Sequence, residues 1–120
     1  MKNLLLAATL ILTPMQTFAG QAQIVDAQSR PDGDGSYRFD VTLRHADSGW
    51  DHYADKWEVI GADGQLLGER ILLHPHVNEQ PFTRSLGKIP IPAGTRQVQI
   101  RAHDSVHGYA ERKFTVELSR

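Results

Sequence analysis

Hydrophobic and polar residues alternate with a period of two over most of the chain from Gln23 onward. The clearest run covers residues 37–43, where every second residue is apolar, and similar runs follow at 98–102 and 114–118. Such alternation is typical of strands with one buried face, whereas an amphipathic helix would repeat every three or four residues. No window of ten residues shows a helical pattern. The sequence therefore predicts an all-β chain.

Turn-forming residues separate these runs, with Pro, Gly and Asp gathered at 31–35, 62–64 and 90–94. We expect seven strands, near 22–29, 36–45, 56–61, 66–73, 82–87, 96–104 and 112–118. This spacing favours an immunoglobulin-like antiparallel β-sandwich, with a small open β-barrel as the alternative. Trp57, in the third predicted strand, is expected to be buried in the core.

The first nineteen residues predict a signal peptide. Lys2 is followed by an apolar stretch at 4–12, and Thr17 and Ala19 are small residues at the positions a signal peptidase reads. The apolar stretch is shorter than the roughly 20 residues that a membrane span needs, and the chain has no cysteine for lipid attachment. We expect cleavage after Ala19, leaving one domain of residues 20–120 that is periplasmic or secreted and not inserted in a membrane.

Composition and charge exclude several classes of partner. The chain has 13 Lys and Arg residues against 14 Asp and Glu residues, and the leader removes one lysine but no acid. A slightly negative domain predicts no binding to nucleic acid. Without cysteine, hydrophobic packing must hold the domain together. Both methionines lie in the leader, so the mature domain has no sulfur ligand for Cu(I).

The predicted order of strands gathers the histidines at one end of the sandwich. If successive connections alternate between the two ends, the loops at 46–55, 74–81 and 105–111 share one end. The chain's six histidines lie in or beside these loops: His45, His52, His74, His76, His103 and His107. Binding and catalytic residues are concentrated on loops held by a rigid scaffold, so we predict the functional site at this end.

His74-Pro75-His76 is the sharpest local feature within these loops. Residues two apart in an extended segment point to the same side, and Pro75 favours that conformation. Both imidazoles could therefore bind one Zn or Cu(II) ion, with further ligands from neighbouring loops. The candidate metal ligands are His74, His76, His107, His52 and His103. The alternative is that these histidines are ordinary surface residues packed against aromatic side chains.

Strand parity places His45 and Asp104 at the rim of the core, on the second and sixth predicted strands, which face each other. We expect a structural hydrogen bond between them. A role for Asp104 in orienting a metal-bound histidine is the other possibility. The remaining candidates for binding a ligand are Trp50, Asp51, Tyr53, Glu79 and Tyr109.

Catalytic signatures are missing from the sequence. Neither Ser85 nor Ser105 lies in a nucleophile elbow, and no glycine-rich phosphate loop precedes a helical pattern. We therefore expect a binding module rather than an enzyme, with a histidine-lined site for a metal ion or a small polar ligand. The alternative is an immunoglobulin-like interaction domain that binds another exported protein or a carbohydrate through Trp50, Tyr53 and Tyr109 without metal.

Three strings carry a resemblance to other proteins: GWDHYADKW at 49–57, HPHVNEQPFTRS at 74–85 and DSVHGY at 104–109. Together they resemble a group of short, uncharacterised exported proteins of Gram-negative bacteria. The resemblance implies export to the periplasm and implies that the histidine loops belong to one module. It implies no particular activity.

Overall fold

A computed structural model describes residues 20–118, and these residues form strands and loops without any helix. The strands are β1 (Gln23–Pro31), β2 (Ser36–Arg44), β3 (Ala54–Ile60), β4 (Leu66–Ile71), β5 (Phe82–Pro90), β6 (Gln97–Asp104), β7 (Gly108–Tyr109) and β8 (Phe114–Glu117). The all-β prediction is confirmed. The predicted signal peptide, residues 1–19, lies outside the described residues. Within that described part, no helix is long and apolar enough to cross a membrane.

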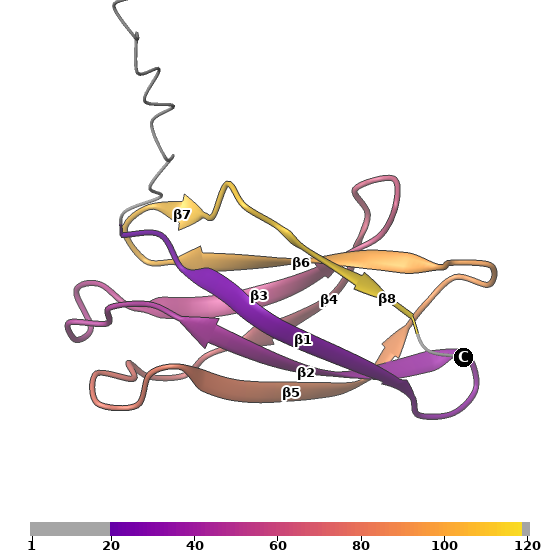
Figure 1. Cartoon of the computed structure of the whole chain (residues 1–120), viewed down its shortest axis with the longest axis horizontal. Helices are drawn as coiled ribbons and strands as arrows, with labels where there is room; N and C mark the ends of the chain where they lie inside the picture. Colours follow the sequence, from indigo (N-terminus) through magenta and orange to yellow (C-terminus); the bar gives the residue numbers. More distant parts are fainter. Residues whose placement is uncertain (1–19, 119–120) are drawn as a thin grey trace, which may run out of the picture.

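The strands form two antiparallel sheets. One sheet has the order β1-β2-β5, and the other has the order β4-β3-β6. Both β7 and β8 pair with β6: β7 at its C-terminal end and β8 along its N-terminal half. The sheets approach each other at both edges, where β1 contacts β8 and β4 contacts β5. Figure 1 shows β1 crossing in front of the strands of the second sheet.

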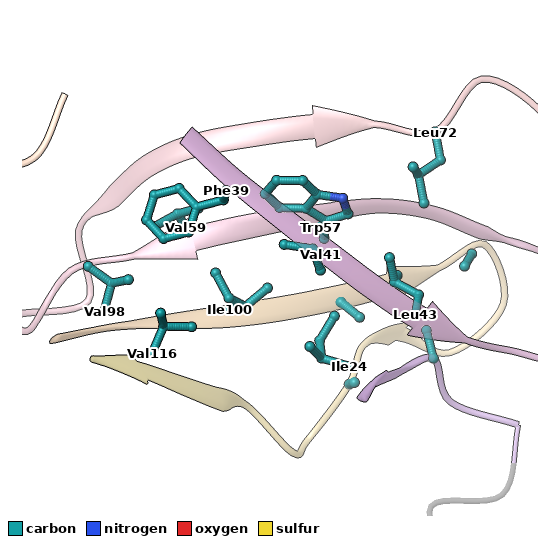
Figure 2. Close-up of a cluster of buried hydrophobic side chains, with 14 of the residues drawn as sticks. Ile24, Phe39, Val41, Leu43, Trp57, Val59, Leu72, Val98, Ile100 and Val116 are labelled. Carbon is teal, nitrogen blue, oxygen red and sulfur yellow. The ribbon is translucent and has the colours of Figure 1, made fainter. Parts of the chain in front are cut away.

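One hydrophobic core lies between the two sheets. Alternate residues of β2 point into it and meet alternate residues of β3 and β6 (Figure 2). The hydrophobic residues of this core without any solvent exposure are Phe39, Val41, Leu43, Ala54, Trp57, Val59, Ile100 and Ala102. The predicted burial of Trp57 is therefore confirmed. This alternation continues to the ends of β2 and β6. The last inward-facing positions therefore lie beside the loops that carry the histidines.

The bounds of most strands differ from the predicted ones by one or two residues, and two differences are larger. β5 continues to Pro90, three residues past the predicted end, and a register shift opposite β2 accommodates Lys88 at φ +56°. The Gly87-Lys88 pair resembles a turn in sequence, but here it is an irregularity within the strand. The short strand β7 was not predicted, because two residues are too few to show a period.

The loops divide between the two ends of the molecule as expected. At one end the Ser105 amide donates to the Tyr53 carbonyl at 3.0 Å, and the His76 amide donates to Asp47 Oδ2 at 2.7 Å. We call this end, formed by residues 45–53, 72–81 and 105–107 and seen at the left of Figure 1, the histidine end. At the opposite end, the Ile91 amide bonds to the Gly35 carbonyl at 3.0 Å.

Tyr109 of β7 helps to cover a buried charge on the outer face of the second sheet. The Glu58 side chain is only 2% exposed, and Arg101 donates to its Oε1 from Nη2 at 2.6 Å and from Nε at 3.0 Å. The Tyr109 hydroxyl donates to Oε2 at 3.2 Å. Burial would raise the pKa of Glu58, but the hydrogen bond and the charge of Arg101 outweigh it and lower that pKa.

Replacing Trp57 with alanine should lower the free energy of unfolding by about 3–5 kcal/mol, as truncation of a buried large aromatic side chain does. The matched control is Trp50→Ala, because Trp50 is 67% exposed and its loss should change stability by no more than about 0.5 kcal/mol. Urea denaturation measures both. A loss below about 1 kcal/mol for Trp57→Ala would contradict the described core.

Glu58→Gln should lower the free energy of unfolding by about 1–3 kcal/mol at pH 7, because a charge-assisted hydrogen bond to Arg101 is lost. The folded pKa of Glu58 lies below its unfolded value. The stabilisation is therefore present above the unfolded pKa, near 4.3, and is lost as pH falls through the folded pKa.

The difference between the wild type and Glu58→Gln should thus narrow below about pH 4, in denaturation curves measured from pH 7 to pH 3. Glu69→Gln is the control, since Glu69 contacts Lys56 from a more exposed position and should contribute at most about 1 kcal/mol. A difference for Glu58→Gln that stays constant with pH would rule out this ion pair.

Candidate metal centre

Two imidazoles and one carboxylate meet at the histidine end. His45 directly follows β2, His52 lies just before β3, and Asp104 is the last residue of β6. His45 Nε2 lies 3.2 Å from His52 Nε2, which lies 3.0 Å from Asp104 Oδ1. One ligand atom from each residue lies within 4.8 Å of the other two. These three residues form what we call the central cluster.

Strand periodicity and one turn bring the cluster together. His45 and Asp104 continue the inward-facing positions of β2 and β6, and both are buried. His52 is held by a tight turn in which the Ser48 amide bonds to the His52 carbonyl and the His52 amide bonds to the Gly49 carbonyl. Gly49 has φ +133°, a conformation that residues with a side chain rarely adopt.

Asp47 orients His45 toward the cluster. His45 Nδ1 donates to Asp47 Oδ1, which leaves Nε2 facing His52. The same carboxylate accepts hydrogen bonds from the amides of Ala54 at 2.9 Å and His76 at 2.7 Å. A carboxylate that fixes the tautomer and the orientation of a ligating histidine is a common feature of metal sites.

Asp104 is completely buried and only partly hydrogen-bonded. Its Oδ1 accepts from the amides of Val106 at 2.9 Å and His107 at 2.7 Å, and its Oδ2 has no partner. Burial would raise the pKa of Asp104, but these hydrogen bonds from His107 and Val106 lower it below its usual value. The carboxylate is therefore ionised at neutral pH.

The protons available cannot satisfy the contacts within the cluster. Three contacts join four atoms in a row: the Gly20 carbonyl oxygen, His45 Nε2, His52 Nε2 and Asp104 Oδ1, at 2.9, 3.2 and 3.0 Å. The two oxygens only accept, and each imidazole nitrogen carries at most one proton. Three contacts thus share at most two protons, so at least one contact has none. A proton on His45 Nε2 would also make this buried imidazole a cation, since its Nδ1 already donates.

The spacing of these atoms suits a bound metal ion. Ligands 2.0–2.1 Å from zinc are about 3.3–3.4 Å apart at tetrahedral angles and about 2.9 Å apart at right angles. The separations of 3.2 Å and 3.0 Å between neighbouring cluster atoms fall in or close to this range. A cation could take the place of the proton that these opposed lone pairs lack.

Two further residues border the cluster. His107 Nδ1 lies 3.1 Å from Asp104 Oδ1, and the rings of His107 and His52 have centres 4.9 Å apart. The side chains of His107 and His52 are 35% and 25% exposed, so the cluster is open to solvent on this side. The Gly20 carbonyl contacts His45. Both residues could complete the coordination of an ion.

The other predicted metal ligands do not join the cluster. His74 Nδ1 donates to the Pro75 carbonyl at 3.1 Å. His76 stacks on Phe82 and its Nε2 accepts from Arg84 at 2.8 Å, and burial together with Arg84 lowers the pKa of His76. His103 Nδ1 bonds to Asp55 at 2.5 Å. The neighbouring guanidinium of Arg84 makes the His74-His76 pair a poor cation site.

The structure gives His45 and Asp104 a shared contact with His52 instead of the expected direct hydrogen bond. Both residues occupy the predicted rim of the core, but His52 Nε2 lies between them. Sequence reasoning also did not assign Asp47 to the site, although its spacing of two from His45 is the same spacing that drew attention to His74 and His76.

The predicted ligand-binding residues do not form one surface. Trp50 and Tyr53 contact each other edge to face at 5.5 Å. Tyr109 instead lies on the outer face of the second sheet, beneath the guanidinium of Arg101. Glu79 bonds to Arg84 at 3.4 Å, and Asp51 is exposed in the turn before β3.

The chain is similar in sequence to a curated protein. Over 97 residues it is 43% identical to a protein of Halomicrobium mukohataei described as "Putative lipoprotein". The match covers 81% of this chain and 47% of that protein, so the chain spans about half the length of the curated relative that it matches. No protein-family model matches the chain, and no solved structure matches it significantly.

Asp47→Ala should lower the free energy of unfolding by at least about 2 kcal/mol, because it leaves the buried amides of Ala54 and His76 without an acceptor. Asp51→Ala, in the same loop but exposed, is the matched control and should be neutral within about 0.5 kcal/mol. Chemical denaturation measures both variants. Equal stability of the two would show that Asp47 does not hold the loops together.

Proposed function

We propose that this chain is an exported, non-enzymatic binding protein that holds one Zn²⁺ or Cu²⁺ ion through His45, His52 and Asp104, with His107 as a further ligand. The observation that carries this proposal is the deficit of protons among the contacts of the central cluster. A divalent cation satisfies every lone pair there at once. The buried, unpartnered Oδ2 of Asp104 adds an acceptor that a cation could also use.

The charge of the cluster favours a cation. Asp47 and Asp104 are both buried carboxylates, and their hydrogen-bond partners in the described chain are imidazoles and backbone amides rather than lysine or arginine. Imidazole nitrogen is a ligand typical of zinc and copper, whereas calcium and magnesium take oxygen ligands. The donor set therefore favours Zn²⁺ or Cu²⁺.

Export is supported by the N-terminal sequence and by the name of the relative. The first nineteen residues have the three parts of a signal peptide. A protein described as a lipoprotein belongs to the cell envelope, and the proposal extends only this location to the present chain. We place the mature domain in the periplasm or outside the cell.

The strand order supports an immunoglobulin-like architecture for this domain. β1, β2 and β5 correspond to the A, B and E strands, and β3, β6 and β8 correspond to C, F and G. The buried Trp57 lies on the strand that corresponds to C. β4 departs from the constant-type arrangement, because it joins β3 rather than β5.

The exposed Trp50, packed against Tyr53, favours a second candidate function, which is a metal-free interaction domain. The two functions make opposite predictions about metal ions, so one experiment separates them.

Calorimetric titration of chelator-treated protein with Zn²⁺ or Cu²⁺ should show one ion bound per chain, and the ion should raise the melting temperature by mass action. His52→Ala should weaken binding by at least about 10–100-fold. Removing a residue that only hydrogen-bonds to a metal ligand already lowers metal affinity by that factor. Asp104→Asn should do the same, because it removes the charged ligand atom.

His74→Ala is the matched control and should bind the ion as the wild type does, since His74 lies outside the central cluster. Circular dichroism checks that each variant is folded. Loss of binding in His74→Ala but not in His52→Ala would contradict the proposed centre. A wild type that binds neither ion would favour the interaction domain.

A further inference from the structure

We infer that the α-amine of Gly20, freed by removal of the signal peptide, is itself a ligand of this metal centre. The inference rests on the proposed function and adds to it a dependence on processing. Before cleavage the nitrogen of Gly20 is a planar amide whose lone pair is delocalised, so it binds no metal ion while it keeps its proton. After cleavage it is a primary amine. The complete centre would then exist only in the mature protein.

The chain is held so that Gly20 reaches the central cluster. Its carbonyl oxygen lies 2.9 Å from His45 Nε2, the same atom that contacts His52. Ala22, two residues later, is buried in the core, and the Gln21 side chain accepts a hydrogen bond from the Glu111 amide at 3.0 Å. These contacts fix the start of the domain against the cluster before β1 begins.

The fit at Gly20 leaves no room for a side chain. A Cβ atom there would lie 2.5 Å from Cε1 of His107, and Gly20 has φ +84°. Only glycine allows this close approach of the main chain to an imidazole. The predicted first residue of the mature chain is therefore the one residue type that fits against His107 while its carbonyl oxygen lies beside His45.

The chemistry of a chain end completes the inference. The amine nitrogen and the carbonyl oxygen of one residue form a five-membered ring with a bound ion. In a chain that begins at Gly20, rotation about the Cα–C bond moves the amine while the carbonyl keeps its place near His45. A metal ion takes the place of a proton on an α-amine, as it does on an imidazole.

Two forms of the domain test this inference. One begins at Gly20 and the other retains Ala19 with its own amine acetylated, so that they differ only at the chain end while the core and the histidines are the same. Calorimetric titration with Cu²⁺ should show binding at least about tenfold weaker in the form that retains Ala19. Losing a ligand should lower the affinity at least as much as losing a residue that hydrogen-bonds to a ligand. Mass spectrometry of the exported protein should find Gly20 at the N-terminus.

Electron paramagnetic resonance separates a lost ligand from simple crowding by Ala19. When the protein carries ¹⁵N-glycine, the spectrum of Cu²⁺ bound to the form that begins at Gly20 should show coupling to one ¹⁵N nucleus, and the longer form should not. Equal affinities together with no ¹⁵N coupling would overturn the inference while leaving the metal centre intact. A mature N-terminus elsewhere would also overturn it. If neither form binds Cu²⁺ or Zn²⁺, the proposed function itself fails.

Discussion

The carboxylate of Asp104 is buried completely at the end of β6, and an ionised group in that position must be compensated by hydrogen bonds or by an opposite charge. The neighbouring structure supplies part of this compensation. The loop after β6 turns so that the amides of Val106 and His107 point at Oδ1, and His52 approaches the same oxygen from another loop. The other oxygen, Oδ2, has no partner. This incomplete compensation is the feature that a divalent ion would remedy in the proposed centre.

Asp47 differs from Asp104 in that its whole carboxylate is used to hold loops together in the structure. Both of its oxygens are bonded: Oδ1 to His45 and the Ala54 amide, and Oδ2 to the His76 amide. It thereby joins the loops of the histidine end and holds His45 in one tautomer. Asp104 shares the burial of Asp47 but not its complete set of partners. In the proposed metal centre the roles divide accordingly: Asp47 would position His45, and Asp104 would supply a ligand oxygen.

Much of the fold could be predicted from the sequence, because alternation of apolar residues is a local property that packing between two sheets then preserves. The same periodicity placed His45 and Asp104 correctly at the rim of the core. The grouping of ligands could not be predicted in this way. His74-Pro75-His76 has a suggestive spacing, but Arg84 occupies Nε2 of His76, and a local pattern cannot reveal such a contact. The central cluster instead joins residues from three separate loops and strand ends. Which residues belong to it depends on contacts in three dimensions, such as those of His52 with both His45 and Asp104.

The most direct test of the central claim is a crystal structure of the mature protein soaked with Zn²⁺, with anomalous diffraction recorded at the zinc edge. The proposed centre predicts one strong anomalous peak, 2.0–2.2 Å from His45 Nε2, His52 Nε2 and an oxygen of Asp104. A peak between His74 and His76, or none at the histidine end, would contradict it.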